Sequence, residues 1–393
     1  MTATLVDNVV GSRSVLYVAF ELGWSEWKLA FSTGPAEAPR LRALRARNLV
    51  ALQNEIAKAK KRFGLPEACP VVCCYEAGRD GFWLHRYLTA HGMVNNVVDS
   101  ASIEVKRRGR RRKTDRLDAG KLLSMLIRWH QGEKNVWSVV QVPSVLDEDR
   151  RQLHRDLGEM KGERTQHSNR IKGLLAAYGL AVAQVDAGFP KLLAELRQWD
   201  GQPVPTELQK RLVREHERWQ LVDRQIRDLE NERAREIRNS KAEPIVKVRK
   251  LLNLRGIGDN SAWLYVMEFF GWRHIRNRKQ LGSLAGLTPT PYQSGDSDQE
   301  QGISKAGNRR LRTMAVEIAW CWLQYQPGSA LSQWFQKRFG SGNSRQKRIG
   351  IVALARKLLV ALWQYLETDA VPAGAEIIAW NMKKGKKRET MAV

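Results

Sequence analysis

Cysteine is scarce in this chain, and its placement argues against two common cysteine-based architectures. Only Cys69, Cys73, Cys74 and Cys321 occur in 393 residues. No C-x-x-C pair is matched by a second such pair, so a structural zinc site is not indicated. Cys73 and Cys74 lie in an apolar run, where cysteines are more often buried core thiols than metal ligands, and nothing indicates a disulfide framework. This usage fits the reducing cytoplasm.

Targeting and membrane-spanning signals are missing as well. The first fourteen residues, MTATLVDNVVGSRS, lack a signal-peptide pattern. No uninterrupted apolar run reaches the length of about 18 residues that indicates a transmembrane helix. We therefore expect a cytoplasmic protein.

Acidic residues are heavily outnumbered by basic ones. The chain has 41 Asp and Glu against 66 Lys and Arg, a formal net charge of +25. Such an excess indicates a polyanionic partner, because basic side chains gain affinity by releasing counterions from phosphates. A basic soluble protein without that partner is the alternative. The clustering of the basic residues favours nucleic acid.

Apolar residues over 1–145 alternate between strand-like and helix-like patterns. Short apolar runs predict strands, and amphipathic segments between them predict helices. This alternation indicates an α/β domain with a mixed sheet. The expected strands are Ser14–Glu21, Trp27–Phe31, Pro70–Glu76 and Met93–Asp99, and the expected helices are Ala43–Phe63, Phe82–His91 and Thr114–Trp129.

The hydrophobic period changes after this domain. Apolar residues at spacings of three, four or seven predict two long helices, Asp147–Tyr178 and Leu208–Ile237. A segment with Pro and Gly, Gly188–Pro205, separates them. We interpret residues 146–244 as a helical, coiled-coil arm of the kind that often mediates dimerisation. Two ordinary helices of a bundle are the alternative.

Residues 245–393 are predicted to form a mainly helical domain with a basic tail at 383–388. The sequence Gly256-Ile257-Gly258 lies between two apolar helical segments and resembles a helix–hairpin–helix turn. Glycines let backbone amides approach a phosphate closely in such a turn. A plain turn between helices is equally open.

Four carboxylates of the first domain form a candidate metal site. Glu21 and Glu76 end two predicted strands, whereas Asp115 and Asp118 lie three residues apart on one face of a helix start. Converging carboxylates can hold divalent metals that activate the attacking oxygen and stabilise the leaving oxygen in phosphoryl transfer. Mg²⁺ prefers such oxygen ligands. Acidic residues in a first helical turn also occur simply because they favour the helix dipole.

A basic run stands directly before these aspartates. Residues 106–116 read KRRGRRRKTDR, with eight basic residues in eleven. Backbone-phosphate binding is the obvious role, and a solvated charged loop is the alternative. The predicted phosphate contacts here are Lys106, Arg107, Arg108, Arg110, Arg111, Arg112 and Lys113.

The polar, glycine-rich segment Gly286–Arg312 holds a candidate nucleophile, Ser294, in what we expect to be an exposed loop. A serine hydroxyl needs a base or a metal to become a good nucleophile. No histidine lies nearby in sequence, so a metal held by the acidic domain is the candidate activator. A loop serine is far more often only a turn residue. The predicted phosphate contacts in this segment are Lys305, Arg309, Arg310 and Arg312.

Together these segments resemble transposases of the IS110/IS1111 type, over nearly the whole chain. KTDRLDAGKL at 113–122 resembles the family's third and fourth acidic positions, and YEAGRDGFWLHRYL at 75–88 resembles the segment of the second. LRGIGDNSAW at 254–263, LAGLTPTPYQSG at 284–295 and GISKAGNRRLR at 302–312 form the most specific signature.

The resemblance implies an RNase H-like (RuvC-like) DEDD domain followed by a transposase domain with a catalytic serine. Glu76, Asp115 and Asp118 would then be Mg²⁺ ligands. Ser294 would be the nucleophile that joins covalently to DNA. The family usually has aspartate at the first acidic position, where this chain has Glu21, which is one methylene longer.

The resemblance also implies partners. Characterised members use a structured RNA encoded by the element to choose donor and target DNA. They assemble so that the acidic domain of one subunit meets the serine domain of another. A guide RNA and a homo-oligomer, dimer or tetramer, are therefore expected.

The expected reaction is a phosphodiester transesterification, in which Ser294 attacks a DNA phosphate and Mg²⁺ stabilises the charge that develops there. Two other functions stay open. The chain could be a metal-dependent nuclease of branched DNA that uses water as nucleophile. It could also be a nucleic-acid-binding protein without catalysis, an alternative that Glu21 in place of aspartate keeps open.

Overall fold

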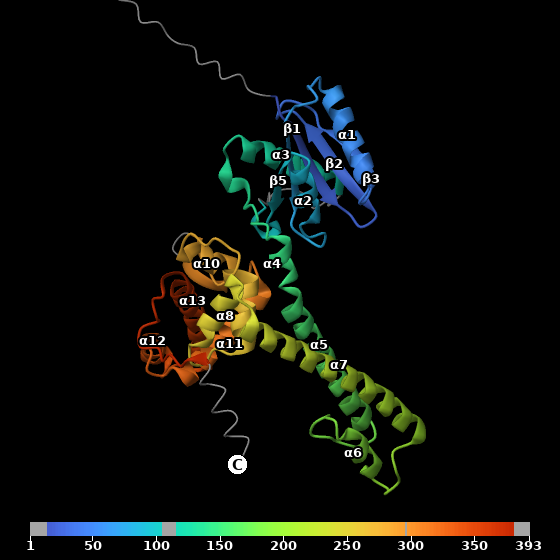
Figure 1. Cartoon of the computed structure of the whole chain (residues 1–393), viewed down its shortest axis with the longest axis vertical. Coiled ribbons are helices and arrows are strands. Elements are labelled where there is room, and N and C mark those ends of the chain that lie inside the picture. The colour runs from blue at the N-terminus through green and yellow to red at the C-terminus, as the bar shows by residue number, and fades with distance from the viewer. Residues whose placement is uncertain (1–13, 104–114, 295–296, 381–393) are drawn as a thin grey trace, which may run out of the picture. The chain divides into compact units, whose positions relative to one another are not determined.

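The computed structural model, shown in Figure 1, describes residues 14–103, 115–294 and 297–380. The chain divides into two compact units, Met1–Val142 and Pro143–Val393. The first is an α/β unit and the second is mainly helical. The predicted arm and the predicted C-terminal domain therefore belong to one unit. The basic run at 106–113 and the basic tail at 383–388 lie outside the described residues.

A five-stranded mixed sheet, in the order β3-β2-β1-β4-β5, forms the centre of the first unit. β1 pairs antiparallel with β2, and β2 pairs antiparallel with β3. β4 and β5 continue the sheet from β1 in parallel. The predicted α/β class with a mixed sheet is thus confirmed. The strands are β1 Leu16–Leu22, β2 Glu26–Ser32, β3 Arg40–Arg45, β4 Val71–Glu76 and β5 Val94–Val98.

Helices cover both faces of this sheet (Figure 1). Residues of β1 alternate between the faces, as a strand requires. Leu16, Val18 and Phe20 belong to the core under α1 and α2, whereas Tyr17 and Ala19 pack with α3. Burial on both faces explains why β1 reads as a continuous apolar run. The helices are α1 Leu49–Arg62, α2 Trp83–Ala90 and α3 Asp115–His130, with short 3₁₀ turns at Ser100–Ser102 and Lys134–Val136.

The expected helix Ala43–Phe63 was wrong at its beginning, because Arg40–Arg45 forms the edge strand β3. Its sequence RLRALR is dominated by arginine, and charged side chains are common on edge strands. The helix begins only after Asn48, whose side chain accepts a hydrogen bond from the Ala51 amide and caps α1.

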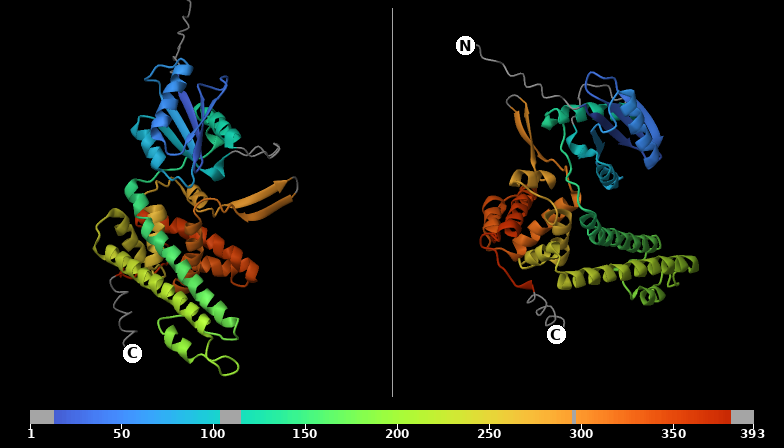
Figure 2. Two further views of the ribbon diagram at one scale, coloured as in Figure 1. Left: turned by 90° about the vertical axis from the view of Figure 1, so that its right-hand side faces the viewer. Right: turned by 45° about the horizontal axis from the view of Figure 1, so that its top comes forward.

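Two long antiparallel helices, α5 and α7, form an arm within the second unit, with α6 packed at its far end (Figure 2). Two buried carboxylates hold the pair together. Glu215 of α7 accepts hydrogen bonds from His167 and Arg170 of α5. Asp223 of α7 accepts one from Arg164, at 2.6 Å. The predicted pair of long helices is confirmed, and its coiled-coil character stays a prediction. The helices of this part are α4 Val145–Asp149, α5 Gln152–Ala176, α6 Phe189–Glu195 and α7 Thr206–Asn239.

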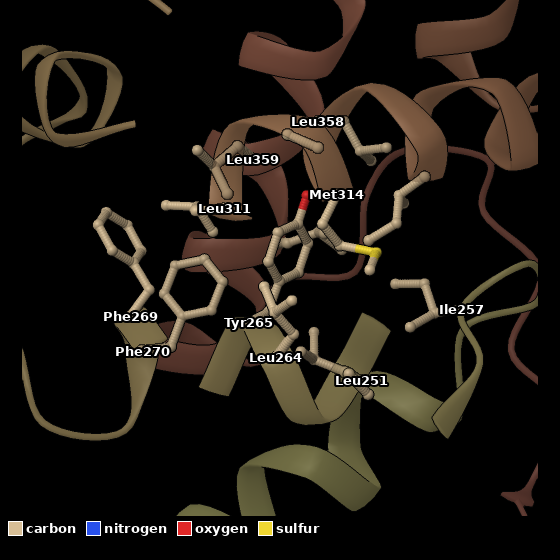
Figure 3. Packing of buried hydrophobic residues seen from close by; sticks show 14 of the residues in the cluster. Leu251, Ile257, Leu264, Tyr265, Phe269, Phe270, Leu311, Met314, Leu358 and Leu359 are labelled. Carbon is tan, nitrogen blue, oxygen red and sulfur yellow. The ribbon is translucent and has the colours of Figure 1, made fainter. Parts of the chain in front are cut away.

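The rest of the second unit has one large apolar core. Figure 3 shows Tyr265 of α9 directed toward Met314 of α11 and the neighbourhood of Leu358 on α13. An 18-residue window of α13 has a mean hydropathy of 1.5, but half of it is buried, as in the core helix of a folded domain. The helices are α8 Glu243–Leu252, α9 Asp259–Tyr265 with a π-helical continuation Val266–Phe270, α10 Arg278–Leu284, α11 Arg309–Tyr325, α12 Ala330–Phe339 and α13 Ser344–Thr368.

A two-stranded antiparallel hairpin interrupts the helices of this unit and projects away from them (Figure 2). Its strands are β6 Pro289–Ser294 and β7 Ser297–Ile303. Ser294 was expected in an exposed loop, but it is the last residue of β6 and pairs with Ser297. The strands contain Pro, Gln, Ser and Asp, which are poor strand signals.

Candidate active site

Glu21 and Glu76 are neighbours at one edge of the sheet. β1 and β4 run parallel, and Phe20 of β1 lies opposite Tyr75 of β4. The next residue on each strand is the glutamate. Parallel strands bring their carboxyl ends to the same edge, so the two predicted metal ligands stand side by side at the end of the paired region.

Both glutamates belong to the face of the sheet that α3 covers. Ala19 of β1 and Cys74 of β4 pack with α3, and each stands two residues before its glutamate. Side chains two apart on a strand share a face. Glu21 is half-buried and Glu76 is exposed, so the face opens to solvent where the strands end.

The backbone of α3 begins near this edge. At the other end of the helix, the His130 Nδ1 atom lies 2.9 Å from the Tyr17 hydroxyl, at the start of β1. Ala119, in the first turns of α3, lines a hollow together with Lys28, which pairs with Glu21 across β1 and β2. The helix thus runs antiparallel to β1. Its first turn, with the backbone of Asp115–Asp118, lies toward the Glu21 end.

The structure therefore brings two of the four predicted carboxylates together and places the helix start of the other two near them. Among the described side chains, no three Asp, Glu, His or Cys residues gather closely enough to hold a metal ion. The side chains of Asp115 and Asp118 lie outside the described set. The two adjacent glutamates supply hard oxygen donors that suit Mg²⁺. The metal-binding role of all four stays a prediction.

Two glycines hold the base of the hairpin that carries Ser294. Gly286 has φ +67°, and a Cβ there would lie 1.9 Å from the Ala306 carbonyl oxygen. Gly307 has φ +85°, and a Cβ there would lie 2.1 Å from the Leu284 oxygen. Only glycine fits this close crossing of two backbones. The crossing fixes where the hairpin leaves the helical core.

The predicted phosphate contacts of this segment have different surroundings. Arg309 and Lys305 are exposed, and Lys305 has φ +55°, which is uncommon for a side-chain-bearing residue. Arg310 lies 3.5 Å from Glu159 of α5. The Arg312 guanidinium donates to the carbonyl oxygens of Ala285 and Ala306, so it braces the base of the hairpin. These two hydrogen bonds favour a structural role for Arg312 at the base of the hairpin over a phosphate contact.

A buried carboxylate that was not predicted from the sequence connects the start of α11, directly after the hairpin, to α5. Glu268 lies in the π-helical segment and is 1% exposed. It accepts hydrogen bonds from His154 Nε2 at 2.9 Å and Arg155 Nε at 2.8 Å, both on α5. It also accepts one from Asn308 Nδ2 at 3.1 Å. Burial would raise the pKa of Glu268, but the hydrogen bonds and charge of these partners hold that pKa well below its usual range.

Glu268 thereby joins three parts of the second unit. Asn308 caps α11, its side chain accepting from the Leu311 amide. α5 is the first long helix of the arm. A single Glu within the apolar sequence VMEFF was the available signal, because a buried charge needs partners.

The turn Gly256-Ile257-Gly258 serves as a connection between helices. Its Gly258 amide donates to the Ser261 hydroxyl in a capping arrangement. A Cβ on Gly256 would lie 3.2 Å from Tyr325 of α11, so this turn packs inward. These contacts favour the plain interhelical turn over a phosphate-binding hairpin.

Comparison with known proteins agrees with the resemblance found in the sequence. Residues 248–333 match the family described as Transposase IS116/IS110/IS902. The Sinorhizobium fredii protein y4rJ, which is named as a transposase, is 40% identical over 92% of this chain and 94% of its own length. This chain belongs to the IS110/IS1111-type transposase family.

More distant relatives include transposases of named insertion sequences. The transposase for IS1328 of Yersinia enterocolitica is 27% identical over 54% of this chain and 60% of its own length. The transposase for IS1111A of Coxiella burnetii is 26% identical over 58% and 61%, respectively. Family membership makes this transposase a DNA-recombining enzyme in general terms, with DNA as its substrate class.

Proposed function

We propose that this transposase recombines DNA through a covalent serine–DNA intermediate, with Mg²⁺ held by its N-terminal carboxylates. The observation that carries the proposal is the placement of Glu21 and Glu76 side by side at the end of β1 and β4. The strand order, three antiparallel strands followed by two parallel ones, supports an RNase H-like first unit.

Mg²⁺ would be held by Glu21, Glu76, Asp115 and Asp118, and when bound it would supply positive charge to a DNA phosphate. The chain's own contribution is to fix the ligands. Two of them stand on hydrogen-bonded strands, which hold their backbones more rigidly than a loop would. The N-terminal end of α3 places the positive end of its helix dipole near the sheet edge where β1 and β4 end.

Ser294 would provide the attacking oxygen. Its Oγ would form a bond to phosphorus while one bridging P–O bond of the DNA breaks. The serine loses its proton and the departing DNA oxygen gains one, so the phosphodiester becomes a serine phosphodiester. Reversal of the same step with a different DNA oxygen would complete strand exchange.

A structured guide RNA and a homo-oligomer belong to the same proposal. The net charge of +25 supports a partner with many phosphates. The α5–α7 arm offers an extended surface for a second subunit, as many helical arms do. Purified protein is expected to carry one specific RNA, and sequencing of the bound RNA tests this. Recovery of random RNA alone would contradict RNA guidance.

The alternative is a metal-dependent nuclease with water as nucleophile, since the two adjacent glutamates alone would suit that reaction. A covalent adduct separates the two. Wild-type protein incubated with element-end DNA and Mg²⁺ should yield a protein–DNA species that survives denaturing electrophoresis. Ser294→Ala should abolish it, while Ser297→Ala, across the hairpin, serves as the matched control. Cleavage that persists in Ser294→Ala without an adduct would establish the nuclease.

A further inference from the structure

An exposed tryptophan stands beside the pair of glutamates. Trp24 follows Glu21 by three residues, in the turn between β1 and β2. It is 67% exposed, whereas Trp27, on β2 of the same unit, is fully buried. Exposure of so large an apolar side chain is informative, because burial of the ring would be favourable.

Two arginines from other turns meet this indole. Arg47 comes from the connection between β3 and α1, and its guanidinium carbon lies 4.8 Å from the Trp24 ring centroid. Arg79 follows Glu76 by three residues, and its guanidinium carbon lies 5.0 Å from the same centroid. The fold thus gathers three separate turns next to the edge where β1 and β4 end.

A buried carboxylate holds both guanidinium groups in place. The Asp80 side chain is only 7% exposed. Its Oδ1 accepts from Arg47 Nη2 at 3.3 Å, and its Oδ2 accepts from Arg79 Nη2 at 3.4 Å. Arg47 Nη1 also donates to the Trp24 carbonyl oxygen at 3.2 Å. Because these side chains are already held in place, less conformational entropy is lost when they contact a ligand.

Both arginine side chains are partly exposed, and Arg47 has an uncommon backbone conformation. The side chains of Arg47 and Arg79 are 45% and 54% exposed, so part of each guanidinium faces solvent. Arg47 has φ +66°, a conformation that costs energy in a side-chain-bearing residue and that clusters at functional sites. Two arginines against one aspartate leave a positive charge beside two glutamates.

We propose that Trp24, Arg47 and Arg79 bind an unpaired DNA nucleotide next to the phosphate that would meet the Mg²⁺ site of Glu21 and Glu76. This inference rests on the proposed function for the location of that phosphate. An exposed indole can stack on a base that has left the duplex, and guanidinium groups bind the neighbouring phosphates. The arginines also offset the repulsion between the glutamates and DNA. The group is therefore a substrate-positioning site.

The test measures binding without catalysis. Full-length protein is titrated into a fluorescein-labelled single-stranded DNA oligonucleotide in EDTA, and Kd is obtained from fluorescence anisotropy. Trp24→Ala should raise Kd about tenfold, the scale expected for loss of one base–aromatic stack. Trp24→Phe should recover most of the affinity. Trp199→Ala is the matched control, because Trp199 is 92% exposed and belongs to the second unit.

The arginines are tested by the salt dependence of the same binding. Arg79→Ala should weaken binding and reduce the slope of log Kd against log salt by about 0.7, the value for one phosphate of a single strand. Arg62→Ala is the control, because Arg62 is exposed in the last turn of α1, which leads into the start of β4 and not to its Glu76 end. Circular dichroism melting establishes that each variant is folded.

Unchanged single-strand affinity in a folded Trp24→Ala variant would overturn the proposal. Loss confined to an RNA oligonucleotide, or confined to duplex DNA, would overturn it as well. The measurement needs neither Mg²⁺ nor Ser294. A missing covalent adduct would therefore reject the serine reaction while leaving this binding result to be judged by itself.

Discussion

The sheet edge of the first unit and the interior of the second use glutamate in opposite ways. Glu268 is fully enclosed and meets His154, Arg155 and Asn308, all of which donate to it. Glu21 and Glu76 instead stand next to each other at the carboxyl ends of two parallel strands, where the sheet opens to solvent. A carboxylate surrounded by donors stabilises a structure. A pair of adjacent carboxylates suits a cation that arrives with the reaction.

The largest expected effect is on activity at the sheet edge. Glu76→Gln removes one charge from the pair, so Mg²⁺ binding and recombination should fall by about a thousandfold, equivalent to several kcal/mol of lost stabilisation. The melting temperature should change little, because Glu76 is exposed. A plasmid recombination assay and a calorimetric melt check the two parts. Full activity in this variant would remove Glu76 from the site.

A comparably large effect, on stability, is expected inside the second unit. Glu268→Ala leaves His154 and Arg155 without their buried acceptor, and the free energy of unfolding should fall by about 3 kcal/mol.

 The Arg155 side chain is 31% exposed, so water can hydrate its guanidinium in the variant and limit the loss of stability. Urea unfolding monitored by circular dichroism measures the change. Glu159→Ala, on the exposed side of α5, is the control and should alter stability by less than about 0.5 kcal/mol.

The smallest expected effect is the pH dependence of the second unit. The pKa of Glu268 is lower in the folded chain than in the unfolded chain, so the unfolded state binds more protons in acid. The stability from this group is fully present above the unfolded value, about pH 4.3, and is lost as pH falls further. The urea concentration at the unfolding midpoint should therefore be lower at about pH 3.5 than at about pH 6. Glu268→Gln should show a shallower drop, and an equal slope in both proteins would contradict this assignment.

Much of the fold could be predicted, because several elements carry strong local patterns. β1 and β4 are apolar up to the glutamate near the end of each, and α5 and α7 keep helical spacing over many turns. β3 was not predicted because its three arginines break the apolar pattern by which a strand is recognised. The β6–β7 hairpin was missed because its strands are polar and pair mainly with each other.

The candidate site was predictable in part. The sequence identified Glu21 and Glu76 as residues at strand ends, but it did not reveal that their strands are neighbours. Trp24, Arg47 and Arg79 escaped notice because they come from three turns that are far apart in the chain. Glu268 escaped notice because its partners lie 40 or more residues away, as in the pair with Asn308.

The sequence by itself determined the basic charge, the alternation of strands and helices, the long helical pair and the family, because each of these is written in local composition, spacing or motifs. Only the tertiary structure decided that Glu21 lies beside Glu76, that Trp24 meets two arginines, and that Glu268 joins the arm to α11. The physical reason is that strand order and long-range packing depend on contacts between distant segments, which no local pattern encodes.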